Sequence, residues 1–229
     1  MTNARRVSYV WAMLKMYGFW RSAATFRVRT ALRLKDLAFE EIMIDLDAGE
    51  QYAPAYVAIN PSASVPALFV DDGAPLTQSL AILEYLEELH PAPALLPGDA
   101  RGKARVRALS LIFAADSHPL IVPRVRRYLA DQLAVDNAGR TNWVKHWFRE
   151  GLVQGEARLA GDPATGRFCH GDSPTFADLC LMSQIYGARG FKVATGDLPT
   201  IERIAAACEG LEAFAASAPL SQPGAPAAH

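Results

Sequence analysis

A serine follows a tryptophan and an arginine at the predicted start of a helix, in the stretch YGFWRSAATFRVR (residues 17–29). The first amides of a helix have no partner inside it, and with the helix dipole they give this end a partial positive charge. The hydroxyl of Ser22 can accept one of these amides as an N-cap, or it can donate to an anion held at the same place. Ser22 is therefore either a plain helix cap or part of a site that stabilises a reactive anion.

Cysteine and charge content limit the chemistry that the chain can support. Cys169, Cys180 and Cys208 are too far apart for a CxxC redox motif and lack the spacing of a zinc site, and their odd number suits a reducing compartment. The 23 Lys and Arg residues nearly balance 24 Asp and Glu, so the net charge of −1 gives no bias toward nucleic acid or a membrane surface. We therefore predict a cytoplasmic protein without a metal site, whose anion site, if present, is local.

The elements that must position Ser22 follow the order βαβ and then ββα. Short apolar or alternating runs predict four strands, at 14–19, 38–46, 65–70 and 74–78. Apolar spacings of three and four predict helices at 22–35 and 79–90, with an irregular or short helical connection at 49–61. In the first helix, Arg27, Arg29, Arg33 and Lys35 are expected mostly to face away from the apolar side. This order of elements is that of a thioredoxin-like domain.

The second half of the chain is predicted to be helical throughout. Residues 90–99 gather three prolines and a glycine and are interpreted as a linker. Long periodic segments without convincing strand character follow, at 101–131, 140–160, 175–190 and 199–216. Thr175 and Asp178 form an Asp variant of the capping box, to which we assign a structural role.

These patterns divide the chain into five parts. They are an N-terminal extension (1–13), a thioredoxin-like domain (14–91), a linker (92–99), an all-helical domain (100–217) and a disordered tail (218–229). The apolar residues within 1–12 are too few and too interrupted for a signal-peptide core, so this stretch is a disordered arm or an over-extended start of the reading frame. Nothing later in the chain approaches the length of a membrane span.

Together these pieces resemble the glutathione transferases, and specifically their zeta class. The motifs that carry the likeness are FWRSAATFRVRTALRLK (19–35), INPSASVPALFVDDGAPLTQSLAILEYLEELHPAPALLP (59–97), DSHP (116–119), SPTFADL (173–179) and GARGF (187–191). The likeness covers nearly all of residues 14–217. It implies the glutathione transferase fold, an α/β plus all-α arrangement in which a thioredoxin-like domain precedes a helical bundle.

The resemblance implies that glutathione is the cofactor and that Ser22 contacts its thiolate. A free thiol has a pKa of about 8.5, so only a few per cent is ionised at neutral pH. Lowering that pKa by about two units requires about 2.7 kcal/mol of preference for the anion, which one charge-assisted hydrogen bond and the helix field can supply. The class usually has serine and cysteine where this chain has Ala23 and Ala24, so Ser22 or Thr25 must act alone. Arg21 either adds positive potential or is simply an exposed arginine.

Two further motifs bind the rest of glutathione if the resemblance holds. Val65 precedes an expected cis Pro66 and presents its backbone to the cysteinyl part, as an added strand would. Gln78 and Ser79 open a helix whose free amides, with the Ser79 hydroxyl, suit the γ-glutamyl carboxylate. A plain N-cap is the alternative for Ser79.

The resemblance also implies a second, electrophile site in the helical half. His118 would assist glutathione or substrate, or would simply pack at a bend before Pro119. Arg124 and Arg189 would hold the two carboxylates of a maleyl substrate, because planar guanidinium groups bind carboxylates in a bidentate way. Arginines on helices are often only solvated, which is the alternative for these two and the more favoured interpretation of Arg126 and Arg127. Asp116 is expected to reach the glutathione of a second subunit in a homodimer.

These assignments predict an enzyme that isomerises a maleyl dicarboxylate, maleylpyruvate or maleylacetoacetate, by thiolate addition, bond rotation and elimination. General conjugation or dehalogenation of a small electrophile is the first alternative. A non-catalytic glutathione-binding module is the second, and Ala23 and Ala24 are its best support. A thioredoxin-type redox protein is disfavoured because no cysteine lies near residues 20–25.

Overall fold

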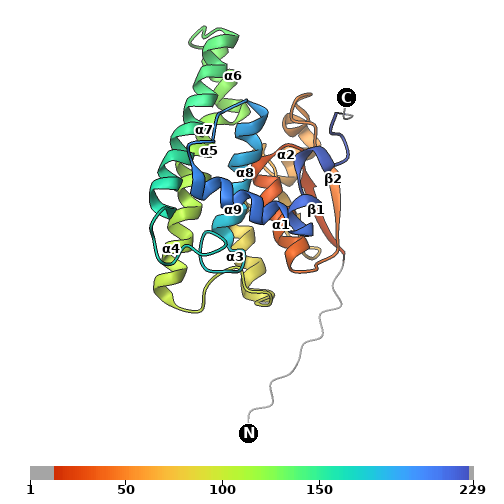
Figure 1. Ribbon diagram of the computed structural model, residues 1–229. Coiled ribbons are helices and arrows are strands. Elements are labelled where there is room, and N and C mark those ends of the chain that lie inside the picture. Colours follow the sequence, from red (N-terminus) through yellow and green to blue (C-terminus); the bar gives the residue numbers. More distant parts are fainter. Residues whose placement is uncertain (1–12, 227–229) are drawn as a thin grey trace.

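The computed structural model describes residues 13–226, which form a small mixed sheet with helices followed by a helical bundle (Figure 1). The first part contains, in chain order, β1 (Leu14–Gly18), α1 (Ala23–Leu34), β2 (Phe39–Met43), η1 (Glu50–Tyr52), α2 (Pro54–Ile59), β3 (Ala67–Phe69), β4 (Leu76–Thr77) and α3 (Ser79–Leu89). The second contains α4 (Ala100–Leu111), η2 (Ile112–Ser117), α5 (His118–Ile121), α6 (Pro123–Asp131), α7 (Asn137–Leu159), α8 (Phe176–Gly190), α9 (Pro199–Glu209), α10 (Glu212–Ala215) and η3 (Pro219–Ser221). The predicted α/β part followed by an all-helical part is confirmed.

The sheet has the order β2-β1-β3-β4, with β1 parallel to β2 and the other pairs antiparallel. Successive residues of β1 point to opposite faces, as a pleated strand requires. Met16 packs into the cluster that contains α1 and α3, while Tyr17 lies 5.9 Å, ring to ring, from Tyr56 of α2. Since Gly18 pairs with Met43, both parallel strands end at one edge, and the chain turns there into α1.

The two parts share one hydrophobic core, which runs from the sheet through α1 into the bundle. Helix α8 lies between α1 and the helices α4 and α7 (Figure 1). Phe26 of α1 meets Tyr186 of α8 edge to face, with ring centroids 5.2 Å apart. A tightly packed interface of this kind can hold groups from both parts at one site.

The cations of α1 correct one expectation. The bounds of the helix match the prediction, but Arg27, Arg29 and Lys35 are buried rather than turned away from the apolar side. The apolar periodicity of the helix did not predict this burial, because the groups that contact these side chains come from distant segments of the chain.

The predicted linker is anchored rather than loose. Leu95 and Leu96 are buried, and their amides donate to the carboxylate of Glu87 at 3.0 and 3.2 Å. Lys35 Nζ donates to the same carboxylate at 2.7 Å and to the carbonyl of Pro93 at 2.9 Å. The segment between the two parts is therefore built into the core.

Local signals explain several helix ends in the second part. The predicted helix 101–131 is divided by a π-helical turn at Ile112–Ser117 and again at Val122, before Pro123. The residue before a proline is driven toward extended backbone, and Val122 has ψ 156°. The capping box at Thr175 and Asp178 is confirmed, with the Thr175 amide donating to the Asp178 carboxylate at 2.8 Å.

The part of the predicted disordered tail that the structure describes is instead packed against the first domain. Residues 219–221 form the 3-10 helix η3, and Gln222 donates to the carbonyls of Ala216 and Ala218 at 2.8 Å each. Gly224 and Pro226 line a cavity with Trp20 and Met43. Composition suggested disorder, whereas the contacts that order the segment come from residues about 200 positions away.

Two predictions lie outside the described residues, because 1–12 and 227–229 are not among them. These are nearly all of the N-terminal extension and the last three residues of the tail. Within residues 13–226, no helix is long and apolar enough to span a membrane.

Candidate active site

Ser22 is the N-cap of α1, as predicted. Its Oγ accepts the amide of Thr25 at 3.2 Å, and its backbone is extended, at φ −68° and ψ 120°. Because a hydroxyl can accept and donate at once, the Ser22 proton remains available for an anion in front of the helix. The first turn carries no acidic residue that would repel such an anion. The cap and the thiolate contact are therefore compatible uses of one side chain.

Thr25 faces the other way. Its side chain is fully buried, and Oγ1 accepts the amide of Phe19 at 3.4 Å. A Cβ on Gly18 would lie 2.6 Å from the Thr25 methyl group, so only glycine fits at this position without displacing the threonine. This arrangement favours Ser22 over Thr25 as the hydroxyl that meets a ligand.

Arg21 brings positive charge to the mouth of α1. Its guanidinium pairs with the carboxylate of Asp47 and lies 5.6 and 5.7 Å from the ring centroids of Phe19 and Trp20. The side chain is partly exposed, so its charge can act on a ligand in solvent.

Val65 and Pro66 are joined by a cis peptide bond, as expected. The carbonyl of the preceding Ser64 accepts the Tyr56 hydroxyl at 2.6 Å and the Asn60 amide at 2.7 Å. Burial raises the pKa of Tyr56 to about 12, so this hydroxyl stays a donor at neutral pH. The backbone leading into Val65 is thus held by two side chains.

Gln78 and Ser79 open α3 as predicted. Gln78 has φ +65°, a left-handed conformation that is uncommon for residues other than glycine and is often found at functional sites. Its side chain makes no cap, so the first turn of α3 has no side-chain acceptor for its amides among the described residues. Such an end suits a carboxylate.

Arg27 was missed as a site residue by the sequence analysis. Its Nη1 donates to Ser79 Oγ at 2.9 Å, and its Nε donates to Ser183 Oγ of α8 at 3.1 Å. The residue lies in a quoted motif, but its spacing within the helix gave no sign that it turns toward α3.

His118 lies beside two cations in the structure. Its pKa is held well below the ordinary value, first by burial and then by the charges of Arg27 and Arg124. It is therefore neutral at pH 7, with a ring that can donate one hydrogen bond and accept another. Arg124 is exposed on α6, and Asp116 is exposed on η2.

Arg189, predicted to hold a substrate carboxylate, and Arg126, for which a surface role was favoured, differ in their contacts. Arg189 is paired with Glu202 and Glu209 of α9, so its charge is already balanced. Arg126 is half-buried on α6, its Nε has no hydrogen-bond partner within residues 13–226, and its guanidinium lies 5.9 Å from the ring of Phe191. Burial lowers its pKa, and the nearby charges of Arg21 and Arg140 lower it further, against the opposite effect of Asp47.

These contacts form two groups. One lies at the mouth of α1 and brings Arg126 close to Arg21, the neighbour of Ser22. The other lies at the start of α3 and joins Ser79, Arg27 and His118. The contacts of Arg189 lead to α9 instead, and the described residues show no ion pair for Asp116.

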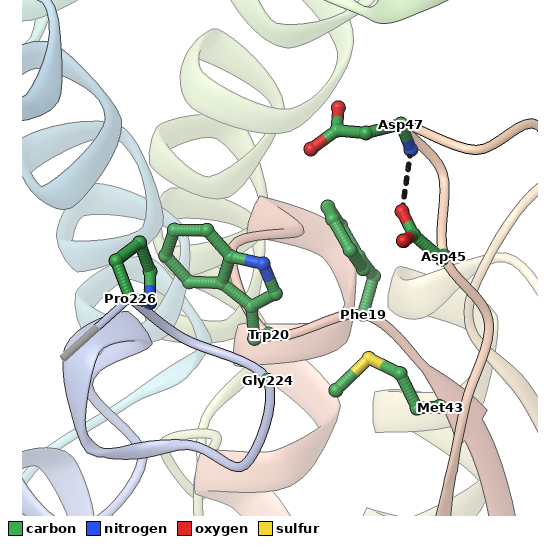
Figure 2. Close-up of a pocket in the computed structure, with 7 residues that line it drawn as sticks. All are labelled: Phe19, Trp20, Met43, Asp45, Asp47, Gly224 and Pro226. Atoms are coloured by element: carbon green, nitrogen blue, oxygen red, sulfur yellow. Dashed lines mark hydrogen bonds between the residues drawn. The ribbon is translucent and has the colours of Figure 1, made fainter.

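A cavity of about 260 Å³ lies beside the mouth of α1, on the side of β2 (Figure 2). It is lined by Phe19, Trp20, Met43, Asp45, Asp47, Gly224 and Pro226. Figure 2 shows Pro226 next to the Trp20 indole, with the two aspartates on the opposite wall. None of the predicted site residues lines this cavity, but Phe19, Trp20 and Asp47 in its wall contact Arg21, so the cavity adjoins the group at the mouth of α1.

Within the described residues, no cluster of three or more His, Cys, Asp or Glu side chains could hold a metal ion. The three cysteines are buried free thiols, and burial raises the pKa of each. Thiols in such surroundings are unreactive.

Comparisons with known proteins agree with this geometry. The family described as "Glutathione S-transferase, N-terminal domain" matches residues 12–88. A maleylpyruvate isomerase of Ralstonia sp. is 44% identical over 211 residues, which are 92% of this chain and 99% of the relative. A maleylacetoacetate isomerase of Pseudomonas aeruginosa is 42% identical over 217 residues, 94% of this chain and 100% of the relative.

Solved structures give the same result. The crystal structure of a maleylacetoacetate isomerase from Methylobacterium extorquens AM1, with bound malonate and glutathione, has a TM-score of 0.91 and 50% identity, covering 93% of this chain and 100% of the other. The holo structure of a maleylpyruvate isomerase described as a bacterial zeta-class glutathione transferase has a TM-score of 0.88 and 43% identity, with coverage of 93% and 100%. This chain belongs to the glutathione transferase family, in its zeta class.

Proposed function

We propose that this protein is a glutathione-dependent cis–trans isomerase of a maleyl dicarboxylate, with maleylpyruvate or maleylacetoacetate as substrate. The observation that carries the proposal is that Arg21, the neighbour of the N-cap Ser22, pairs with Asp47, and that Arg126, whose Nε has no hydrogen-bond partner among the described residues, lies near both of these charges. A site with more guanidinium groups than carboxylates has a net positive charge, which suits a substrate with two negative charges. The relatives named above act on maleyl dicarboxylates, which supports the same conclusion.

The residues present fit glutathione. Ser22 offers a hydroxyl proton and the field of α1 to the thiolate, and the uncapped start of α3 offers amides and the Ser79 hydroxyl to the γ-glutamyl carboxylate. The backbone of Val65 is assigned to the cysteinyl part. Bound glutathione supplies the thiolate that adds to the cis double bond and leaves again once the resulting single bond has rotated.

The residues of this chain then have three tasks. Ser22 keeps the sulfur anionic by donating its hydroxyl proton. Arg21 and Arg126 hold the carboxylates of the substrate and stabilise the enolate charge that develops when the double bond is opened. Neutral His118, near Arg124, orients the bound glutathione or substrate by a hydrogen bond and adds no charge to the site. In this proposal Arg21 and Arg126 take the role predicted for Arg124 and Arg189.

An absorbance assay with each maleyl substrate tests the proposal. Native protein should isomerise one of them only when glutathione is present, and Ser22→Ala should lose about 100- to 1,000-fold in rate, the cost of one lost donor to an anion. Turnover of chlorinated substrates without isomerisation would instead favour conjugation or dehalogenation. Retention on immobilised glutathione without thiolate formation would favour a non-catalytic module, which Ala23 and Ala24 support.

We also propose that the protein is a cytoplasmic homodimer that takes part in aromatic catabolism. The three buried free thiols support a reducing compartment, and family membership supports the dimer. The exposed Asp116 is assigned to the glutathione of the second subunit. Sedimentation analysis of the native protein and of Asp116→Ala tests the dimer, and glutathione titration of both tests the contribution of Asp116.

A further inference from the structure

Helix α1 carries two buried arginines, two residues apart, whose partners differ in kind. Arg29 is bound in a bidentate way by Glu41, with Nε 2.8 Å and Nη2 2.5 Å from the two carboxylate oxygens, and it also donates to the Ser217 carbonyl. Arg27 has no carboxylate within ion-pair distance among residues 13–226. Its contacts are the hydroxyls of Ser79 and Ser183, and its Nη2 has no hydrogen-bond partner there.

A buried guanidinium without an anion is costly, because it has lost its hydration and gained no opposite charge. Arg27 is only 2% exposed, and burial lowers its pKa, yet an arginine keeps its proton in proteins. The nearby His118 is neutral, and burial raises the pKa of the neighbouring Cys180, so neither group balances the charge. Apolar residues of similar size would serve the core better.

The hydrogen bonds of Arg27 lead to the start of α3. Because Nη1 donates to Ser79 Oγ, one lone pair of that oxygen is occupied, and the Ser79 proton is free to point toward a ligand. Ser79 is the first residue of an 11-residue helix whose N-cap, Gln78, makes no side-chain cap. Two independent features therefore favour an anion there, namely an open helix start and an uncompensated buried cation one hydroxyl away.

We propose that Arg27 is a positioning residue that directs the Ser79 hydroxyl, and adds its own unbalanced charge, toward the γ-glutamyl α-carboxylate of glutathione. This inference rests on the proposed function, because it takes glutathione as the ligand. Arg27 contacts the carboxylate site through its hydrogen bond to Ser79, and it is held in place by its hydrogen bond to Ser183 of α8. The carboxylate site therefore depends on the interface between the two parts of the protein. Arg29, by contrast, serves stability alone.

The two arginines should respond in opposite ways to replacement by methionine. Arg27→Met removes a buried charge that has no counter-ion, so the ligand-free protein should unfold at an equal or higher temperature. Arg29→Met leaves Glu41 without its partner and should lower the unfolding temperature. A purely structural role for Arg27 predicts a loss of stability in both variants.

Calorimetric titration with two ligands measures the role directly. The ligands are glutathione and γ-aminobutyryl-cysteinyl-glycine, which lacks only the γ-glutamyl α-carboxylate. Native protein should prefer glutathione, and Arg27→Met should lower the affinity for glutathione about 10- to 100-fold, the range for one lost charge-assisted contact, while binding of the analogue changes little. Arg29→Met should keep the preference. Arg27→Lys keeps the positive charge but not the forked guanidinium, so it should retain part of the preference for glutathione over the analogue. This variant replaces Arg27→Met in the test if the methionine variant does not fold.

The outcomes separate this inference from the function it rests on. If native protein binds glutathione and both Arg27 variants keep the full preference over the analogue, the role of Arg27 is wrong while the proposed function stands. If the preference disappears as expected but neither maleyl substrate is isomerised, the role of Arg27 stands and the isomerase proposal fails. If native protein binds no glutathione, both are overturned.

Discussion

Lys35 and Glu87 form an ion pair inside the protein, with Nζ 2.7 Å from Oε2 and side-chain exposures of 0% and 13%. The lysine lies at the end of α1 and the glutamate in α3, and together they bind the backbone of the segment that connects the two parts. This small polar network therefore anchors the segment that connects the glutathione half to the helical half.

Breaking this network should lower the free energy of unfolding substantially. Glu87→Gln leaves the Lys35 charge buried without its counter-ion, and we expect a loss of about 3 kcal/mol or more in the free energy of unfolding. Denaturant titration measures it. Glu84→Gln is the control on the same helix, because its exposed pair with Arg107 should contribute less than about 1 kcal/mol. Equal losses in the two variants would contradict the role of the buried pair.

The hydroxyl of Ser22 should govern the ionisation of a bound thiol. In Ser22→Ala the pKa of glutathione in the complex should rise by about one to two units, since one charge-assisted hydrogen bond is lost. Ultraviolet absorbance of the thiolate, followed across pH, gives this value. Thr25→Val is the control, because Thr25 is buried against Phe19 and its loss should affect stability without raising the thiol pKa. A rise only in the Thr25 variant would reverse the assignment.

Arg126 should matter more than Arg189 for a dicarboxylate. Arg126→Gln should raise KM for the maleyl substrate about tenfold or more, the usual effect of losing a hydrogen bond to a charged group. Arg189→Gln should change KM little, because Arg189 is paired with Glu202 and Glu209. Arg127→Gln is the matched control on α6, where Arg127 stacks 5.0 Å from the ring of Tyr52. The proposal fails if the Arg189 variant shows the larger rise in KM.

His118 should make the protein less stable as the pH falls. Its pKa in the folded protein is well below the unfolded value of about 6.5, so between these two values the unfolded chain binds more protons. The free energy of unfolding therefore decreases as pH drops below about 6.5, by at most about 1.4 kcal/mol per pH unit from this group. His118→Gln should flatten the curve over that range, as measured by denaturant titration at several pH values.

Asp178 has the opposite effect on how the free energy of unfolding depends on pH. Burial raises the pKa of Asp178, so its contribution to stability is lost as pH rises through the folded value. Because Asp178 is present in both proteins, it cancels in the comparison of native and His118→Gln. Parallel curves for the two proteins would show that His118 is not the group responsible.

Much of the site followed from local patterns. The N-cap at Ser22, the start of α3 at Ser79 and the capping box at Asp178 are set by residues within a few positions of each other, whereas the cis bond before Pro66 was expected only from the family resemblance. The π-helical turn at Ile112–Ser117, the break before Pro123 and the order of the tail were not predicted. The tail depends on Trp20 and Met43, which are distant in the chain and close only after folding.

The amino-acid sequence by itself determined the order of strands and helices, the places where helices begin, and the family, because periodicity, capping and motifs are local properties. Only the tertiary structure decided which cations are balanced. Arg29 meets Glu41 and Arg189 meets the glutamates of α9, whereas Arg27 and Arg126 each keep a donor without a partner among the described residues. The reason is physical: the free energy of a buried charge depends on which groups distant segments bring beside it, and helix spacing does not contain that information.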